Sequence, residues 1–284
     1  MPGVWLDLVG LRIDLSECDA DTRALLRETW SEFLRDSQPD GMDLRIRAVS
    51  DAAVLQDEPS PEPEIRRDGE VWHLLRYDFD ATWDARTSRV DVRYAAQMAA
   101  FSSFLRVLLS IVLRKYGGVL LHAASVRAAD GVVLFPGVSG TGKSTIASLA
   151  SPRGILSDEI SALRPTADGL VRAYPTPFWG DLERKRAADA GTLSRIVILK
   201  RGVASPSLEP APRAEASAAL LEGALYFDVL AIAEKRDFIA SVQVLAERTA
   251  CYRLRFDLPS NPWSLLDPLE APAPSSGAAR DSSG

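Results

Sequence analysis

Hydrophobic positions along this chain follow two spacings, one of two residues and one close to 3.6 residues, which are typical of strands and helices respectively. Residues 4–14 alternate apolar and polar side chains well enough for one or two strands. In residues 19–35 the apolar side chains recur at the spacing of one helix face. These side chains are Leu25, Leu26, Trp30, Phe33 and Leu34. The pattern therefore predicts a mixed α/β protein.

The same patterns predict elements along the rest of the chain. Strands are expected at residues 4–14, 42–49, 70–80, 88–94, 119–126, 132–135, 155–157, 160–163, 170–173, 195–200 and 251–256. Helices are expected at residues 19–35, 95–116, 143–150, 213–221 and 224–233. Residues 56–69 are rich in Pro, Glu and Asp and are expected to form an exposed loop.

Turn residues refine these boundaries. Residues 70–80 and 88–94 are expected to pair as a β-hairpin around residues 83–86. Gly117 and Gly118 end the helix expected at residues 95–116. The Asp130-Gly131 pair favours a hairpin turn between the next two strands.

The expected elements divide the chain into three parts. Residues 1–94 predict a small N-terminal α+β region, and residues 95–268 a larger α/β domain. Residues 269–284 are mostly Ala, Pro, Ser and Gly, a composition that predicts a disordered tail.

A glycine-rich turn follows the strand expected at residues 132–135. Gly137, Gly142, Lys143 and Ser144 fit the phosphate-loop pattern G-x-x-x-x-G-K-[ST] at every fixed position. Glycines allow successive N–H groups to converge on an anion, the lysine reaches the β- and γ-phosphates, and the hydroxyl can bind Mg²⁺. We therefore expect a nucleoside triphosphate, taken as ATP, to bind here. The residues expected to bind it are Gly137, Ser139, Gly140, Thr141, Gly142, Lys143, Ser144 and Thr145.

Two adjacent acids follow the short strand expected at residues 155–157. Asp158 lies fifteen residues after Lys143, which leaves room for one short helix and a return strand beside the phosphate loop. One of the two acids is then expected to bind Mg²⁺ or its waters, and the other can accept a proton from an attacking hydroxyl. The alternative is a solvated acidic turn after a strand.

His122 is one of two histidines and lies on the strand expected at residues 119–126, next to the strand that leads into the phosphate loop. A lone histidine among apolar residues is more often a core residue than a catalytic one, and we assign that ordinary role to His73. His122 is a candidate for catalysis because of the motif that surrounds it.

The segments Leu-Leu-His-Ala-Ala-Ser-Val, Phe-Pro-Gly-Val-Ser-Gly-Thr-Gly-Lys-Ser-Thr and Leu-Ser-Asp-Glu together resemble the catalytic core of HPr kinase/phosphorylase. They are more similar still to the stand-alone HPr-kinase-related proteins of the phosphoenolpyruvate-carboxykinase-like group of P-loop folds. The resemblance is strongest over residues 105–200 and weaker over residues 251–263. It implies that His122, Asp158 and Glu159 flank the transferred phosphoryl group as acid/base and metal-side residues.

The chain departs from that family at two places. The usual Asp-Asp pair is Asp158-Glu159, so the expected base is one methylene longer. The Arg-Gly-Leu-Gly type loop of the bifunctional enzymes is absent, which argues against the reverse phosphorolysis and against HPr as the acceptor. Residues 174–181 stand in its place, with Phe178 and Trp179 as either a hydrophobic plug or part of a substrate-facing loop.

Three cations follow that loop. Arg184, Lys185 and Arg186 either face the γ-phosphate or form the solvated face of a helix. The residues themselves leave both interpretations open.

Composition narrows the classes of partner. The 284-residue chain has a net charge of −6, so a nucleic-acid or anionic-membrane partner is not expected. The apolar stretch at residues 101–113 is interrupted by Arg106 and is too short to span a bilayer. No secretory signal pattern is expected at the start of the sequence. Cys18 and Cys251 lack metal-site spacing and suit a reducing cytoplasm, with one disulfide as the alternative.

The sequence thus predicts an ATP- and Mg²⁺-dependent kinase built on an HPr-kinase-like P-loop core, with a small N-terminal α+β region. Lys143 holds the triphosphate, Ser144 and Asp158 bind the metal, and Glu159, assisted by His122, takes the proton. The resemblance implies a serine of a peptide or small protein as acceptor, for instance a ribosomal precursor peptide. A small-molecule kinase and a nucleotide-binding regulator with slow ATPase activity are the alternatives, and homo-oligomerisation is left open.

Overall fold

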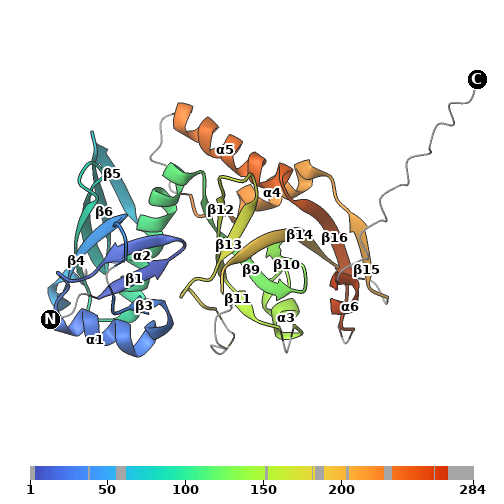
Figure 1. Cartoon of the computed structure of the whole chain (residues 1–284), viewed down its shortest axis with the longest axis horizontal. Coiled ribbons are helices and arrows are strands. Elements are labelled where there is room, and N and C mark those ends of the chain that lie inside the picture. The colour runs from blue at the N-terminus through green and yellow to red at the C-terminus, as the bar shows by residue number, and fades with distance from the viewer. Residues whose placement is uncertain are drawn as a thin grey trace, which may run out of the picture.

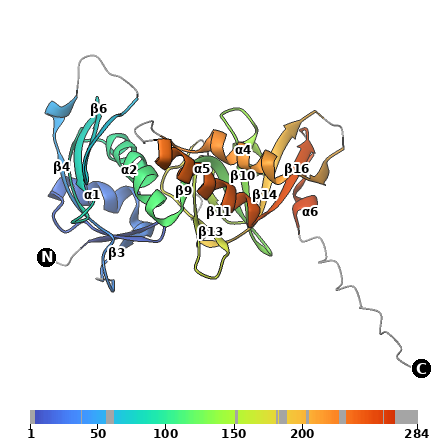
Figure 2. The same ribbon diagram turned by 90° about the horizontal axis from the view of Figure 1, so that it is seen from above.

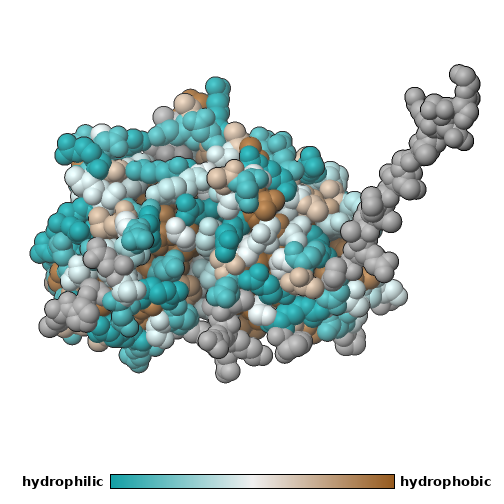
Figure 3. All heavy atoms as spheres, viewed as in Figure 1, coloured by the Kyte–Doolittle hydropathy of each residue, from teal (hydrophilic) through white to brown (hydrophobic). Residues whose placement is uncertain are grey.

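The computed structural model of the chain is a mixed α/β structure with two large sheets (Figures 1 and 2). It describes residues 4–37, 39–55, 62–150, 153–180, 182, 189–202, 205–226, 232–258 and 260–267. No helix among these residues is long and apolar enough to cross a membrane. The face seen in Figure 3 is mostly hydrophilic, with apolar residues interspersed.

The N-terminal sheet has eight strands in the order β3-β1-β2-β4-β8-β7-β6-β5. The strands are β1 (Trp5–Leu8), β2 (Leu11–Asp14), β3 (Leu34–Arg35), β4 (Leu44–Ser50), β5 (Glu64–Asp68), β6 (Val71–Arg76), β7 (Phe79–Asp84) and β8 (Arg89–Tyr94). The only parallel pairings in this sheet join β4 to β2 and to β8, as far as the described residues go.

Helix α1 (Ala20–Thr29) packs beside strand β4 of this sheet. It begins at Asp19, whose carboxylate accepts hydrogen bonds from the backbone N–H of Thr22 and of Ser50, both at 2.7 Å. The first bond caps the helix N-terminus, and the second ties that end to β4.

Helix α2 (Met98–Val112) lies between the two sheets (Figures 1 and 2). Ten of its residues are buried, among them Phe101 and Phe104. A 3₁₀ turn (Leu113–Tyr116) continues it, and Gly117 ends it at a φ of 64°, a conformation that favours glycine. The hydrophobic core that contains α2 runs from the N-terminal sheet to Leu120 and Ile160 in the second sheet, so the two sheets share a core.

The second sheet also has eight strands. They are β9 (Val119–Ala128), β10 (Gly131–Pro136), β11 (Ile155–Ser157), β12 (Ile160–Pro165), β13 (Val171–Tyr174), β14 (Gly191–Arg201), β15 (Ser207–Pro210) and β16 (Ala250–Phe256). Their order is β10-β9-β12-β13-β14-β16-β15, and β11 pairs with β9. An additional parallel pairing of β10 with β14 closes a ring of five strands.

Helices cover both faces of this second sheet. Helices α4 (Arg213–Gly223) and α5 (Ile232–Glu247) pack through Leu220 and Val242 against a core that contains Leu134 of β10. Helices α3 (Lys143–Ser148) and α6 (Trp263–Leu266) pack through Ile146 and Trp263 against a separate core on the opposite side. Strand β10, which leads into the glycine-rich turn, is thus buried on both faces.

Most of the predicted elements are confirmed. Strands β9 and β10 pair as an antiparallel hairpin through Asp130-Gly131, and the helix expected at residues 95–116 ends at Gly117. Both cysteines are free and lie in different cores, Cys18 with the first sheet and Cys251 with the second, so they form no disulfide.

Four secondary-structure predictions are wrong. The helix expected at residues 19–35 ends at Thr29, because Leu34 and Arg35 pair with β1 as strand β3. Residues 64–68 of the expected loop form edge strand β5, which needs to bury only one side chain, Ile65, and is otherwise polar. The expected strand at residues 70–80 is two strands, β6 and β7, with a turn at Tyr77-Asp78. The helix expected at residues 224–233 is absent at Ala224, which makes an isolated β-bridge to Leu121.

The helix of that region lies further along the chain, as α5. Its buried residues Phe238, Val242, Leu245 and Ala246 have helical spacing, so the signal was present in the sequence and was missed. Strand β15 and helix α6 were also missed, and both are only four residues long. The tail expected at residues 269–284 lies outside the described residues.

Candidate functional site

A cavity of about 740 Å³ lies beside the glycine-rich turn. It is lined by His122, Val138, Ser139, Gly140, Gly142, Lys143, Ser144, Thr145, Asp158, Glu159 and Gly180. These residues come from β9, the turn after β10, helix α3, the turn between β11 and β12, and the loop that follows β13. One cavity therefore collects most of the site residues expected from the sequence.

The glycine-rich turn at residues 137–142 connects β10 to α3 with an unusual backbone. Gly137, Gly140 and Gly142 have φ values of 150°, 80° and 98°, a region that side chains with a Cβ rarely adopt. A Cβ at Gly137 would lie 2.9 Å from the Thr141 hydroxyl oxygen, and that hydroxyl donates to the Val138 carbonyl at 2.9 Å. Gly137 and Thr141 thus shape the turn and do not line the cavity.

Lys143 is the first residue of α3, and its side chain folds back over the turn. Its Nζ donates a 2.8 Å hydrogen bond to the Val138 carbonyl, and the residue is only 8% exposed. Burial lowers the pKa of Lys143, while the charge of Glu159 acts in the opposite direction. Lys143 therefore places a positive charge beside the glycine-rich turn, at the cavity that an anionic ligand would enter.

Strand β9 positions His122 by its pairing on both sides. Ala123 pairs with Pro136 at the end of β10, and His122 pairs with Ile160 at the start of β12. The Gly137 N–H donates to the His122 carbonyl at 3.2 Å, and the Ala123 N–H donates to the Glu159 carbonyl at 2.9 Å. His122 is therefore next to both the glycine-rich turn and the acid pair.

The His122 side chain is exposed at the cavity and carries a depressed pKa. Desolvation lowers the pKa of His122 from 6.5, and the positive charges of Lys143 and Arg106 lower it further. The imidazole is consequently neutral at pH 7 and can accept a proton there.

Asp158 and Glu159 lie in the turn between β11 and β12 and have different surroundings. Asp158 is 1% exposed, and its carboxylate accepts hydrogen bonds from the backbone N–H of Gly180 at 2.9 Å and of Leu182 at 3.0 Å. Glu159 is partly exposed at the cavity. The buried acid therefore anchors a loop, and the more exposed acid faces the open space.

Arg106 approaches Glu159 from helix α2. Its Nη2 lies 3.9 Å from a Glu159 carboxylate oxygen, and its guanidinium lies over the Phe178 ring, 5.2 Å from the centroid. Burial lowers the pKa of Arg106, and the Glu159 charge opposes this effect. Sequence reasoning missed Arg106 as a site residue; the available signal was a single cation inside an apolar helix stretch.

The loop at residues 175–180 contains both an apolar anchor and a contact with the acids. Phe178 is fully buried and packs edge-on against Trp30, with the two ring centroids 6.1 Å apart. Thr176 donates from its hydroxyl to the Ile160 carbonyl. Of the two interpretations of this loop, the buried Phe178 fits the hydrophobic plug. The loop that it anchors continues to Gly180, which donates a hydrogen bond to Asp158.

The remaining candidates of this region differ in outcome. Trp179 is partly buried against the core that contains α3, and its Nε1 has no hydrogen-bond partner among the described residues. Arg184, Lys185 and Arg186 lie outside the described residues, as does Asp181. His73 pairs with Arg66 and Thr82 in the N-terminal sheet, away from the cavity. Its side chain is exposed on the outer face of β6, so the prediction that it is a core residue is wrong.

Comparison with known proteins identifies a family. The family model described as ScmC, a SynChlorMet cassette protein, matches residues 93–269, which is more than half of the chain. This range includes α2 and the whole second sheet. No curated protein matches the chain.

Proposed function

The chain belongs to the ScmC family, and from the geometry of its cavity we propose that it is an ATP- and Mg²⁺-dependent kinase that phosphorylates a hydroxyl group. The observation that carries the proposal is one cavity lined by Lys143 and Ser144, by His122, and by Asp158 and Glu159. The resemblance of residues 105–200 to HPr-kinase-related proteins supports the same function.

In this proposal the glycine-rich turn and Lys143 hold the triphosphate. Gly140 and Gly142 bring backbone N–H groups close to the phosphates, and Lys143 exchanges its bond to the Val138 carbonyl for the β- and γ-phosphate oxygens. Catalysis then consists mainly of positioning and of neutralising charge on the transferred group.

Glu159 is the proposed general base. The acceptor oxygen bonds to the γ-phosphorus, its proton passes to the Glu159 carboxylate, and the bond between the γ-phosphorus and the bridging oxygen breaks to release ADP. Arg106 holds Glu159 at the cavity from the α2 side. Neutral His122 lies beside both groups and assists the proton transfer.

The residues at the cavity fit a magnesium ion bound together with a nucleotide. Ser144 and Asp158 both line it and offer oxygen ligands, and the Asp158 oxygens retain lone pairs beyond the two backbone bonds. Among the described residues no three His, Cys, Asp or Glu side chains group into a metal site. Mg²⁺ commonly binds through one or two protein ligands, waters and phosphates, and it would neutralise phosphate charge here.

The proposed acceptor is a serine of a peptide or small protein. This choice rests on the resemblance to HPr-kinase-related proteins, and the replaced signature loop argues against HPr itself. A metabolite hydroxyl is the competing acceptor within the same reaction class.

The first test follows phosphate from γ-labelled ATP incubated with the protein and a cell extract. Label in polypeptide supports the proposal, label in small solutes assigns a small-molecule kinase, and label only in free phosphate assigns an ATPase or regulator. Lys143→Ala is expected to weaken nucleotide binding by about 100-fold or more, because it removes the phosphate-facing cation. Lys200→Ala, on the surface of β14, is the matched control and should bind normally.

Glu159→Gln separates binding from transfer. The amide keeps the shape of the side chain and cannot take the proton, so we expect normal nucleotide affinity and a loss of transfer of about 100-fold or more. Transfer at the normal rate by this variant would show that Glu159 is not the base.

A further inference from the structure

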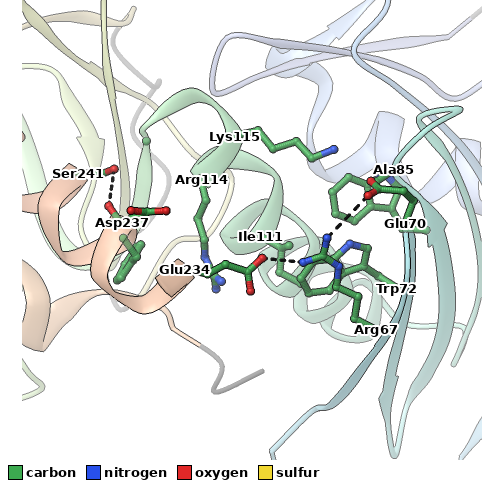
Figure 4. Close-up of a pocket in the computed structure, with 13 residues that line it drawn as sticks. Arg67, Glu70, Trp72, Ala85, Ile111, Arg114, Lys115, Glu234, Asp237 and Ser241 are labelled. Atoms are coloured by element: carbon green, nitrogen blue, oxygen red, sulfur yellow. Dashed lines mark hydrogen bonds and ion pairs between the residues drawn. The ribbon is translucent and has the colours of Figure 1, made fainter. Parts of the chain in front are cut away.

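A second cavity, of about 230 Å³, lies between the N-terminal sheet and helix α5 (Figure 4). None of its lining residues lines the cavity beside the glycine-rich turn. Much of its wall is formed by Trp72 and Trp83 of the first sheet, Ile111 of α2, Lys115 of the 3₁₀ turn after α2, and Phe238 of α5. The volume suits a ligand smaller than a nucleotide.

One wall of this cavity is aromatic. Trp72 and Trp83 stack with ring centroids 5.9 Å apart at an angle of 27°. The Lys115 ammonium lies 4.6 Å from the Trp83 ring centroid, and the Arg67 guanidinium lies 4.9 Å from that of Trp72. Each cation lies over the face of one ring, so aromatic surface and positive charge line the same wall. This combination suits an apolar ligand that carries negative charge.

Two of the three acids that line the cavity, Glu70 and Glu234, have a cationic partner. Arg67 crosses from β5 to Glu234 of α5 with a 2.7 Å ion pair and also lies 3.8 Å from Glu70 (Figure 4). Lys115, in contrast, is exposed and has no ion pair with any described residue. Its three N–H donors are available to a ligand.

Arg114 adds a second cation to the lining of the same cavity. Burial lowers the pKa of Arg114, and the charges of Tyr226 and Glu234 oppose this effect. Its three guanidinium nitrogens are buried and have no hydrogen-bond partner among the described residues. The guanidinium lies against the rings of Tyr226 and Phe238, at 5.1 and 5.4 Å from their centroids. A buried cation without a bonded acceptor produces a positive potential that water screens poorly.

We propose that this cavity binds an organic monoanion, a carboxylate carried on a flat apolar group. The apolar group lies against Trp72 and Trp83, the carboxylate accepts hydrogen bonds from Lys115, and Arg114 strengthens its binding through its field. Glu70, Glu234 and Asp237 also line the cavity, so a dianion such as phosphate is disfavoured. The site does not depend on the kinase function proposed for the other cavity.

Calorimetric titration of the full chain with benzoate tests this assignment. Saturable binding is expected, and benzyl alcohol, which has the same ring without the charge, should bind at least tenfold more weakly. Lys115→Met should weaken benzoate binding about tenfold, and Arg114→Met should weaken it in the same direction. Lys200→Met is the matched surface control and should leave the affinity unchanged.

Lys115 is exposed and Arg114 is largely buried, so Lys115→Met is expected to disturb the fold less than Arg114→Met. Absence of saturable benzoate binding, or equal affinity in Lys115→Met, overturns the proposal. The tripeptide Gly-Gly-Phe and its C-terminal amide distinguish the two sources of such a carboxylate. Binding of the acid form alone assigns a peptide terminus, and binding of benzoate without either peptide assigns a free small molecule.

Discussion

Arg106 shows how a single side chain acquires a role from its neighbours. It interrupts an otherwise apolar stretch of α2, yet its guanidinium contacts the Phe178 ring and lies 3.9 Å from the Glu159 carboxylate. It also contributes to the lowered pKa of His122. Arg106 therefore connects the acid, the histidine and the loop anchor of the proposed active site, although it lies 53 positions before Glu159 in the chain.

The state of His122 gives a prediction that does not depend on activity. Its pKa lies below 6.5, with desolvation as the main cause and Arg106 as one of two contributing cations. Arg106→Met removes a nearby positive charge that disfavours protonation, so the pKa of His122 should rise. NMR titration of the imidazole protons can measure this, because the chain has only two histidines and His73→Gln assigns them.

The control for that titration is Arg47→Met, which removes an exposed arginine from β4 and should leave the pKa of His122 unchanged. A His122 pKa at or above 6.5 in the unaltered protein contradicts the expected environment. An unchanged pKa in Arg106→Met contradicts the influence of Arg106.

At the scale of elements, periodicity and turn chemistry predicted what depends on neighbours in sequence. The β9–β10 hairpin, the end of α2 at Gly117 and the strand–turn–helix around Lys143 all follow from local patterns. Strand β5 was not predictable in this way, because its stability comes from pairing with β6 while most of its side chains remain in water. The other short elements, β15 and α6, were not predicted for the same reason, because tertiary contacts stabilise them.

The loop that ends at Gly180 gives a prediction at this scale. A Cβ at Gly180 would lie 3.1 Å from an Asp158 carboxylate oxygen and 3.2 Å from the Glu159 Cβ. Gly180→Ala should therefore push the loop away from the acid pair, with a loss of about 1–3 kcal/mol in the free energy of unfolding. If the proposed kinase activity is correct, the turnover rate should also fall, as measured alongside urea unfolding.

Gly69→Ala serves as the control for this substitution. Gly69 lies in the β5–β6 turn with a φ of 58°, and a Cβ added there would meet no other atom within 4 Å. The cost of this substitution is therefore backbone strain alone, about 1–2 kcal/mol. The variant should lose stability without losing turnover. Normal turnover in Gly180→Ala would contradict the importance of the contact between the loop and the acids.

At the scale of the whole molecule, the two sheets are joined by one core. The cluster around α2 contains Leu6 and Trp83 of the first sheet together with Leu120 and Ile160 of the second. This core continues past the boundary expected between residues 94 and 95. The ScmC family match begins at residue 93 and so leaves out the sheet that covers one side of α2.

A chain truncated to residues 93–284 should therefore fail to fold as a cooperative unit. It would expose apolar side chains of α2, including Phe101 and Phe104, that are fully buried in the whole protein. We expect aggregation, or strong binding of a hydrophobic dye, and the loss of a cooperative thermal transition. Removing residues 268–284 is the control, since the described core clusters end at Leu266.

A cooperative transition at an unchanged temperature in the 93–284 chain would show that the N-terminal sheet is dispensable for the fold. That outcome would also favour a separate binding or regulatory role for this sheet.

The sequence by itself determined the α/β class, the glycine-rich turn with Lys143, and the pairing of two acids at residues 158–159, because each depends on residues that are close in the chain. Only the tertiary structure decided that β9 places His122 between that turn and Glu159, that Phe178 is a buried anchor, and that Arg106 reaches the acids. Strand register and side-chain packing bring together residues far apart in the sequence, and no local spacing encodes those distances.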